Sequence, residues 1–403
     1  MNPHLCIITQ NHLCRNPRVL KEARLAFEQG YKVTILTTFY DEALYLQDIS
    51  LLQPYAINYL AYTDLRLNKP NRNIYRLAFK IGRELIFKLG IENAWANGYG
   101  PWNIIPAARK QAADLYSIHQ EMPSVQARFL LNAKIPVAFD LEDWYSEDLR
   151  PSQQLGRPKK MLAKAESDAL HKGVFSITTS HILAEELFKK YKGKKPIPIY
   201  NSFPLTERSK LNYQNNYPPL DTIKLIWISQ VTGPGRGIEN MLLALSSINA
   251  TLQFNITLVG KCDPNYQKQL LSLTSEKIKI IFKDPVPPPE ILPLLASHHI
   301  GLATELAESH SRDLTITNKI LHYLLAGLPV LASFTQGHNE IKQLAPEAVI
   351  INHSFDQLAA EIPLLIQEYS IRRNAAWIAG ENLCWENQAT QLIQLWKKYL
   401  SHA

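Results

Sequence analysis

The feature that most constrains this chain is an alternation of short β-branched runs with helical stretches, which occurs in two consecutive series. The first series has its runs at residues 5–9, 32–38, 57–62, 115–119, 137–141, 176–179 and 197–200. The second series has its runs at residues 223–229, 255–260, 278–282, 300–304, 330–333 and 349–352. Strands that alternate with helices form parallel sheets covered by helices. The sequence therefore predicts an α/β protein with two Rossmann-like sheets.

The segments between and after these runs suggest how the chain divides into domains. Helices are predicted at residues 17–29, 238–248 and 318–326, and the tail at 371–400 is predicted to be helical. A polar stretch from Asn201 to Asp221 interrupts the alternation and is the best candidate linker. We predict an N-terminal domain at 1–203, a C-terminal domain at 204–384, and a helix at 385–403 that packs back on the first domain. The two domains are expected to face a cleft, with ligands beyond the carboxyl ends of the strands.

The net charge and the cysteines indicate which ligands the protein favours and whether its thiols are reduced. The 403 residues carry 43 Lys and Arg against 36 Asp and Glu, a net charge of +7, which favours phosphates, nucleotides or acidic lipid surfaces. The basic residues form no reading motif for nucleic acid, so nucleic-acid binding is not expected. The four cysteines form no C-x-x-C pair and indicate reduced thiols. Without a secretory pattern or an apolar run of about 18 residues, we expect a cytoplasmic protein, at most peripheral at the inner face of a membrane.

The segment around Lys319 has the pattern of a phosphate-binding helix start. Thr317 or Asn318 can cap the helix that follows, and Lys319 adds a positive charge to its first turn. A helix N-terminus with unpaired amides and a nearby cation suits a diphosphate. The alternative is an ordinary capped helix with a solvated lysine.

A glycine-rich loop, Gly-Pro-Gly-Arg-Gly at 233–237, lies between a predicted strand and a predicted helix. The third glycine of a dinucleotide-binding fingerprint would fall at Ile238, and no P-loop sequence occurs. The loop does present Arg236 at a helix start, where a guanidinium suits a phosphate pair. The alternative is a tight turn with an exposed arginine.

Polar residues follow two predicted strands of the first domain. His119 ends one strand, and Asp140, Glu142 and Asp143 lie at the end of the next. Such positions favour general acid–base or orienting roles. The alternatives are a structural histidine, a metal-binding D-x-D-like cluster and helix-capping carboxylates. We favour capping or the binding of substrate hydroxyls over metal, because no second acidic cluster or histidine completes a ligand set.

Residues 66–88 hold seven basic residues and one acid, Glu84. Helical spacing predicts a basic face with aromatic neighbours, at Arg72, Arg76, Lys80, Arg83, Phe79 and Phe87. It predicts an opposite apolar face docked on the core, at Ile74, Leu77, Ala78, Ile81 and Leu85. This pattern suits an anionic membrane surface or a lipid-phosphate acceptor, and a second basic run at 189–195 is expected to extend it. The alternative is a solvated helix face.

Six ordered segments together resemble a retaining glycosyltransferase of the GT-B fold, similar to glycosyltransferase family 4. They lie at residues 15–34, 113–119 and 139–144, then at 179–187 with 199–203, at 236–239 and at 317–330. The resemblance implies that the second domain binds a nucleotide-sugar and that the first binds a glycan or lipid-linked acceptor. It implies transfer of a hexosyl group in polysaccharide biosynthesis, without a cofactor and without a divalent metal.

The resemblance also implies roles for particular residues. Arg236 and Lys319 would neutralise the departing diphosphate, assisted by the backbone at Thr317 and Asn318. Glu308 would lie near the donor sugar, and His119 would line the acceptor side as a further catalytic candidate. The remaining candidates are Gln230, Gly235 and His322 on the donor side, and Asn11, Arg15, Glu142 and Asp143 on the acceptor side.

The chain departs from the family pattern at two places. The family has two glutamates eight positions apart where this chain has Leu314 and His322, and a neutral imidazole can still hydrogen-bond ribose hydroxyls. The glycine-rich loop after the first strand is replaced by residues 10–15. Two alternative functions therefore stay open: a nucleotide-sugar epimerase of the same fold, and a non-catalytic subunit that binds a sugar nucleotide.

Overall fold

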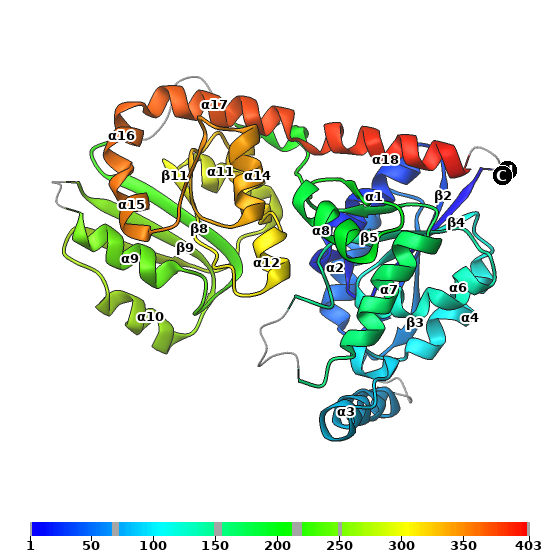
Figure 1. The fold of residues 1–403 in the computed structure, drawn as a ribbon. Coiled ribbons are helices and arrows are strands. Elements are labelled where there is room, and N and C mark those ends of the chain that lie inside the picture. The colour runs from blue at the N-terminus through cyan, green and yellow to red at the C-terminus, as the bar shows by residue number, and fades with distance from the viewer. Residues whose placement is uncertain (1, 67–71, 149–154, 212–219, 249–251, 401–403) are drawn as a thin grey trace. The chain divides into compact units, whose positions relative to one another are not determined.

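The computed structural model describes residues 2–66, 72–148, 155–211, 220–248 and 252–400, which form two compact units (Figure 1). Unit 1 comprises Met1–Ile199, Ser309–Ser311 and Ala389–Ala403, and unit 2 comprises Tyr200–Glu308 and Arg312–Gln388. The chain passes between units at 199/200 and 388/389, and also on either side of Ser309–Ser311; the sequence predicted boundaries at 203/204 and 384/385. Over the described ranges, no helix combines the length and the apolar content needed to cross a membrane.

Unit 1 contains a seven-stranded parallel sheet in the order β3-β2-β1-β4-β5-β6-β7. Its strands are β1 (His4–Ile8), β2 (Lys32–Phe39), β3 (Asn58–Asp64), β4 (Leu115–His119), β5 (Val137–Leu141), β6 (Ser176–Thr178) and β7 (Ile197–Pro198). Every residue of β1, β4 and β5 is buried, as expected for central strands of a sheet covered on both faces.

Three helices of unit 1 begin at residues whose side chains cap them. Asn16 accepts from the Val19 amide and Pro17 occupies the first position of α1, while Asp41 caps α2 and Ser180 caps α8. The helices are α1 (Pro17–Glu28), α2 (Glu42–Leu52), α3 (Arg72–Leu89), α4 (Ile104–Gln111), α5 (Glu121–Gln126), α6 (Arg128–Asn132), α7 (Lys159–Lys172) and α8 (His181–Tyr191). Short 3₁₀ turns are η1 (Leu13–Arg15), η2 (Ala94–Asn97) and η3 (Pro101–Asn103).

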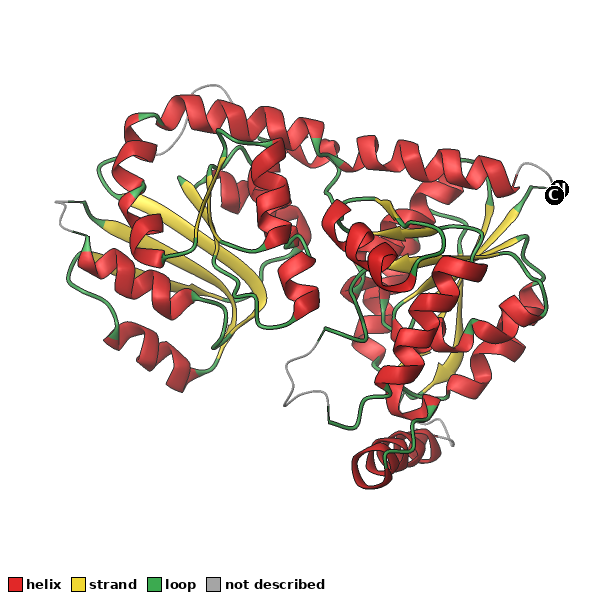
Figure 2. Ribbon diagram, in the orientation of Figure 1, coloured by secondary structure: helices red, strands yellow, loops and turns green. Residues whose placement is uncertain are grey.

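Unit 2 contains a six-stranded parallel sheet in the order β10-β9-β8-β11-β12-β13. Its strands are β8 (Ile223–Thr232), β9 (Phe254–Cys262), β10 (Ile278–Lys283), β11 (Ile300–Ala303), β12 (Val330–Ser333) and β13 (Val349–Asn352). Along β8, Leu225 and Trp227 pack into one hydrophobic cluster and Ile226 into another. Both faces of this sheet are therefore covered by helices, as Figure 2 shows.

Helices of unit 2 alternate with these strands, as the sequence predicts. They are α9 (Ile238–Ser247), α10 (Pro264–Ser272), α11 (Pro288–Ala296), α13 (Asn318–Leu325), α14 (Gln336–Leu344), α15 (Phe355–Ala360), α16 (Ile362–Gln367) and α17 (Tyr369–Asn382), with the 3₁₀ turn η5 (Leu205–Lys210) before the sheet. A short α12 (His310–Leu314) follows β11. The prediction of two parallel α/β sheets is confirmed.

The C-terminal tail is helical, as predicted, and forms two helices. After α17 ends at Asn382, α18 (Trp385–Leu400) begins, and the Trp385 amide donates to the carbonyl of Phe203. Later in α18, the Tyr399 hydroxyl donates to the Val174 carbonyl at 3.0 Å, within unit 1. The predicted linker at 201–221 contains η5, and its residues 212–219 lie outside the described ranges.

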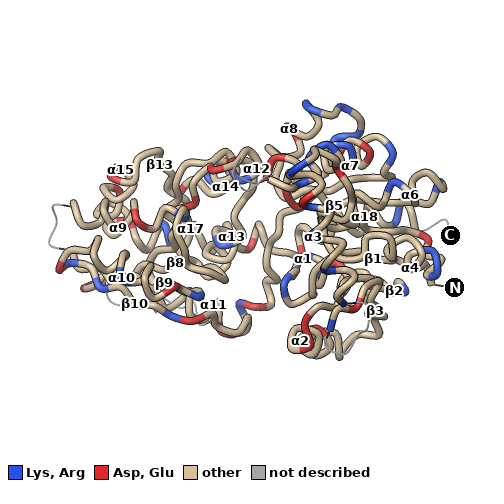
Figure 3. Tube along the Cα trace, turned by 90° about the horizontal axis from the view of Figure 1, so that it is seen from below, with Lys and Arg blue, Asp and Glu red and all other residues tan. Residues whose placement is uncertain are grey.

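Two predictions about basic segments need correction. The apolar face of α3 was expected to dock on the core, but its residues Ile74, Leu77 and Ile81 are exposed. Residues 67–71 of the predicted basic segment lie outside the described ranges. The run at 189–195 was expected to extend a basic surface, but three of its lysines form ion pairs: Lys189 with Glu186, Lys190 with Glu147, and Lys195 with Glu185. Basic and acidic residues are interspersed along the chain (Figure 3).

Candidate functional site

In unit 2 the strand order reverses between β8 and β11, which are neighbours in the sheet but not in the sequence. Open α/β sheets bind ligands at such a switch point, beyond the carboxyl ends of the strands. The two loops that border it run from Gly233 to Gly237 and from Thr304 to Glu308. They are joined directly, because the Thr304 hydroxyl donates to the Arg236 carbonyl at 2.7 Å.

The conformation of the first loop depends on glycine. Gly235 and Gly237 have φ of +77° and +71°, a region that L side chains rarely adopt. A Cβ on Gly237 would also stand 2.0 Å from the Thr304 carbonyl oxygen. The loop is therefore a tight strand-to-helix turn that places the half-buried Arg236 just before α9, where the sequence predicted it.

Lys319 lies in the first turn of α13, and its ammonium group is held from two sides. It forms an ion pair with the carboxylate of Glu305, and it lies 4.0 Å from the centroid of the Trp227 ring. Burial lowers the pKa of Lys319, Glu305 opposes this shift, and the positive charge of Arg236 lowers it further. The structure thus brings Arg236 and Lys319 close enough for their charges to interact.

The start of α13 is fixed by a buried histidine that sequence reasoning missed. His338 Nε2 lies 3.2 Å from the hydroxyl of Thr317, the N-cap residue, and Nδ1 lies 2.8 Å from the Ser333 carbonyl. A carbonyl only accepts, so Nδ1 carries the proton and Nε2 accepts from Thr317. Burial lowers the pKa of His338, which keeps the ring neutral. The Thr317 side chain is therefore oriented away from the helix amides, and Asn318 follows as an exposed first residue.

The carboxylate that contacts Lys319 is Glu305, and the predicted place of Glu308 near the donor sugar stays a prediction. Glu308 Oε2 lies 3.0 Å from Arg312 Nη1, whereas the Glu305 side chain contacts Lys319. The Ser333 hydroxyl donates to the Glu305 carbonyl at 2.5 Å, which ties this loop to the end of β12. The sequence could have pointed to Glu305 only by its position, because Glu305 is the first carboxylate after β11.

Two other donor-side candidates have different surroundings. His322 is buried, with its ring stacked on Phe203 at 3.8 Å and its Nε2 3.4 Å from Glu207 Oε2, so it packs α13 against the segment before β8. Gln230 is exposed on β8, where the register with β9 shifts between Ile228 and Val231. Their predicted contacts with the nucleotide stay predictions.

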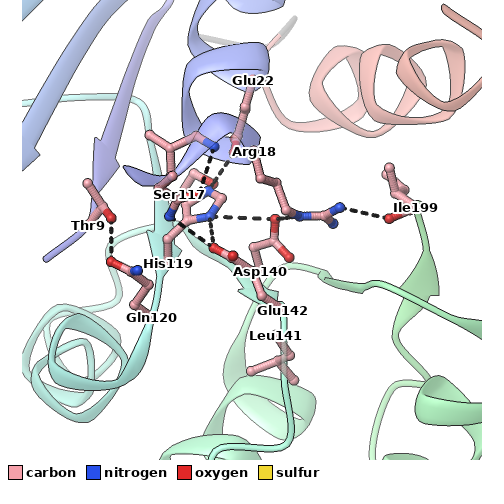
Figure 4. A network of polar contacts seen from close by, with 12 residues as sticks. Thr9, Arg18, Glu22, Ser117, His119, Gln120, Asp140, Leu141, Glu142 and Ile199 are labelled. Carbon is pink, nitrogen blue, oxygen red and sulfur yellow. Dashed lines mark hydrogen bonds and ion pairs between the residues drawn. The ribbon is translucent and has the colours of Figure 1, made fainter. Parts of the chain in front are cut away.

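Unit 1 has an equivalent switch point between β1 and β4. The Thr9 hydroxyl and the Gln10 amide both donate to the side-chain oxygen of Gln120, at 2.7 and 2.9 Å. Gln120 itself has a φ of +66°, which is strained for a residue with a side chain. The loops after β1 and β4 are therefore locked together at the same edge of the sheet (Figure 4).

His119, at the end of β4, is fully buried among carboxylates (Figure 4). Its Nε2 lies 2.5 Å from Glu22 Oε2, and its Nδ1 lies 3.1 Å from Glu142 Oε1 and 3.5 Å from Asp140 Oδ2. Burial alone would lower the pKa of His119, but Glu22, Glu142 and Asp140 outweigh it and raise the pKa to about 10. The ring is thus an imidazolium that donates from both nitrogens. This geometry does not fit a general base, and it gives His119 a role in joining α1, β4 and β5.

Arg18 completes this buried network. Its Nε donates to Asp140 Oδ2 at 2.5 Å and its Nη1 to the Ile199 carbonyl at 2.8 Å. Ligand atoms of Glu22, His119 and Asp140 lie within 4.8 Å of one another, close enough for a metal set. In this structure the three residues are engaged in ion pairs instead, because Arg18 donates to Asp140 and His119 pairs with Glu22. Sequence reasoning missed Glu22 and Arg18 because both lie on α1, about a hundred residues before the strands they contact.

The loop that replaces the family's glycine-rich turn is held by a buried aspartate on α2. Asp48 accepts from the Cys14 amide at 2.8 Å and from the Tyr59 hydroxyl at 2.7 Å, and it pairs with His12 at 2.5 Å. These bonds lower the pKa of Asp48 against the effect of burial. The Tyr40 amide donates to the other nitrogen of His12. The loop after β1 is therefore held in its conformation by a cluster of hydrogen bonds around Asp48 and His12, and not by glycine residues.

The remaining acceptor-side candidates lie around these loops. The Asn11 carbonyl accepts from the Thr37 hydroxyl at 2.9 Å, and Arg15 is exposed. Glu142 is only 19% exposed and also accepts from Asn16 Nδ2 at 3.3 Å, while Asp143 next to it is half-buried. Of the acceptor-side residues, Glu142 is thus the one tied to the buried network.

Comparisons with known proteins agree with this geometry. Residues 222–368, which include the strands of unit 2, match the family model described as glycosyl transferases group 1. A comparison of the sequence with curated proteins finds no match. Among solved structures, HepE from Anabaena in complex with UDP covers 98% of this chain and 100% of its own, with 16% identity and a TM-score of 0.63.

Two further structures have the same fold. A TarM variant from S. aureus, in complex with fondaparinux, alpha-GlcNAc-glycerol and UDP, has 10% identity, a TM-score of 0.69 and 99% coverage of both chains. UDP-GlcNAc 2-epimerase from Neisseria meningitidis, bound to UDP-GlcNAc, has 15% identity, a TM-score of 0.56, and covers 99% of this chain and 100% of its own. The chain has the GT-B fold, and residues 222–368 match a group 1 glycosyl transferase domain. The resemblance inferred from the sequence is confirmed to that extent, and these findings support a transferase that acts on sugars.

Proposed function

We propose that this protein is a retaining glycosyltransferase that moves a hexosyl group from a nucleotide-sugar donor to a glycan or lipid-linked acceptor. The observation that carries the proposal is the placement of two cations at the switch point of unit 2: Arg236 in the loop joined to Thr304, and Lys319 in the first turn of α13. The solved structures of this fold that contain UDP or UDP-GlcNAc support uridine as the donor base.

The two cations act on the leaving group. When the bond from the sugar to the nucleotide breaks, negative charge grows on the diphosphate, and fixed positive charges nearby stabilise that transition state more than the ground state. Glu305 and Trp227 hold the Lys319 ammonium in place beforehand, so little reorganisation is needed during the reaction. Arg236 can bind two phosphate oxygens with its planar guanidinium.

Unit 1 supplies the acceptor side of the proposal. Asn11 and Arg15 follow β1, and Glu142 and Asp143 follow β5; their polar groups are suited to sugar hydroxyls. The buried His119 imidazolium keeps Glu142 ionised, since its pairing lowers the pKa of Glu142 against burial. His119 is therefore a positioning residue in this account, not a catalytic one.

The test is product analysis with UDP-, GDP- and ADP-sugars, each with and without glycan or lipid-linked acceptors and with and without EDTA. We expect acceptor-dependent transfer with the anomeric configuration retained, as read by NMR, and equal turnover in EDTA because Arg236 and Lys319 supply the positive charge. Conversion of the donor sugar without any acceptor would instead identify an epimerase. Nucleotide binding without transfer to any acceptor would instead identify a non-catalytic subunit.

A further inference from the structure

Helix α3 of unit 1 exposes an apolar face. Ile74, Leu77 and Ile81 are 59%, 58% and 41% exposed, and their spacing of three and four residues places them on one side of the helix. Leu89, the last residue of α3, and Ile91 just beyond it are exposed as well. Monomeric soluble proteins rarely expose so many neighbouring large apolar side chains without a binding role.

A neighbouring side of α3 is firmly docked, so the exposure is not a sign of a loose helix. Gly82 is buried so closely against η2 that a Cβ would stand 2.8 Å from the Ala96 amide nitrogen. The Asn93 side chain donates to the Gly82 carbonyl at 2.9 Å, and the rings of Phe79 and Tyr99 lie 5.2 Å apart. The helix is therefore held firmly while its apolar face stays exposed, and α3 itself lies at an edge of unit 1 (Figure 1).

Two exposed tryptophans lie beside this helix. The ring of Trp102 is 5.6 Å from that of Tyr75 on α3, and the ring of Trp95 is 6.2 Å from that of Trp102. Both tryptophans are about two-fifths exposed, at 41% and 42%. Tryptophan is enriched where proteins meet the headgroup region of a bilayer, because its ring is apolar and its N–H is polar.

The charge on α3 is almost all of one sign. Its basic residues are Arg72, Arg76, Lys80, Arg83 and Lys88, and its one acid, Glu84, pairs with Lys88 at 3.0 Å. At about 100° per residue, Lys80 lies about 60° around the helix from Leu77, and Arg76, Arg83 and Arg72 follow further round on the basic face. An amphipathic helix with apolar and basic residues arranged in this way matches a lipid surface that is apolar inside and anionic at its headgroups.

We propose that α3, together with Trp95 and Trp102, docks unit 1 on the surface of an anionic lipid bilayer. Ile74, Leu77 and Ile81 enter the acyl boundary, and the cations beside them bind lipid phosphates. A second copy of the chain fits this surface less well, because a symmetric contact would bring the same cations against each other. The proposal stands apart from sugar transfer, since lipid binding is measured without any donor or acceptor.

Vesicle flotation of the full chain tests this proposal. We expect the wild type to float with vesicles of phosphatidylcholine and phosphatidylglycerol but not with phosphatidylcholine alone, and to be released by high salt. Arg76→Gln/Lys80→Gln should weaken partitioning roughly thirtyfold, since each cation near an anionic surface contributes about one kcal/mol. Leu77→Ser/Ile81→Ser should weaken it at least about tenfold because apolar surface no longer enters the boundary.

Matched controls carry the same changes on exposed residues of unit 2. Leu271→Ser/Ile371→Ser and Lys268→Gln/Lys279→Gln should float like the wild type. Circular dichroism and melting temperature show that each variant is folded. Wild-type protein that stays off anionic vesicles would overturn the proposal, as would wild-type binding by Leu77→Ser/Ile81→Ser. The proposal would also be overturned if the wild type were a dimer that Leu77→Ser/Ile81→Ser alone dissociates. It would be overturned as well if the protein bound an acidic polypeptide and not anionic lipid.

Discussion

At the scale of single residues, the positive charges of unit 2 govern the proposed chemistry. Arg236→Ala should lower turnover about 10²–10³-fold, because one fixed donor to the developing charge is lost. Lys319→Ala should do the same and should also lower the melting temperature, since Glu305 is left buried without its ion pair. Steady-state kinetics and thermal melts check both variants. Lys279→Ala, which removes an exposed charge elsewhere on the sheet, is the control and should leave turnover unchanged.

The buried imidazolium of unit 1 makes a separate prediction about pH. The pKa of His119 is raised from 6.5 to about 10, so between these values the folded protein holds a proton that the unfolded chain has lost. Its contribution to stability is fully present below pH 6.5 and is lost as the pH rises through about 10. The loss should be on the order of a few kcal/mol, and urea unfolding across this range measures it.

The variant His119→Gln isolates this effect. At pH 6 its unfolding free energy should be lower than that of the wild type. Between pH 6 and pH 10 its unfolding free energy should fall much less than that of the wild type. The surface variant His171→Gln should keep the wild-type decline. A decline in His119→Gln as steep as in the wild type would show that the proton is not held by this ring.

At the scale of elements, the turn between β8 and α9 sets the position of Arg236. Gly237→Ala forces a side chain into a φ of +71° and against the Thr304 carbonyl, so it should cost at least about 1–2 kcal/mol of unfolding free energy. Gly233→Ala in the same loop meets nothing within 4 Å and should change stability by less than about 0.5 kcal/mol. Chemical denaturation distinguishes the two, and equal stabilities would contradict the account of the turn.

At the scale of the whole molecule, the strands were the most predictable part. Strands β4, β5, β12 and β13 occupy the residues predicted for them, because β-branched runs bounded by turn residues define a buried parallel strand. The helix predicted at 385–403 begins where α18 begins, at Trp385. On α3, periodicity revealed an apolar face, but periodicity does not say whether another element covers it.

The candidate sites were predictable only where a motif places charge next to a strand end. Arg236 and Lys319 were found in this way, whereas Glu305, His338 and Asp48 were not. Each of these three acts by contacting a residue 14 to 36 positions away in sequence. Such contacts depend on how loops meet at the edge of a sheet, and this cannot be predicted from the pattern of neighbouring residues in the sequence.

The central claim is that unit 2 binds a diphosphate through Arg236 and Lys319. The most direct test is calorimetric titration of UDP, GDP and ADP, each against its nucleoside, into the wild type, Arg236→Ala and the Lys279→Ala control. We expect one diphosphate to bind far more tightly than its nucleoside, and Arg236→Ala to weaken it at least about tenfold, as loss of a charge-assisted hydrogen bond predicts. Equal affinity for nucleoside and diphosphate, or undiminished binding by Arg236→Ala, would contradict the account.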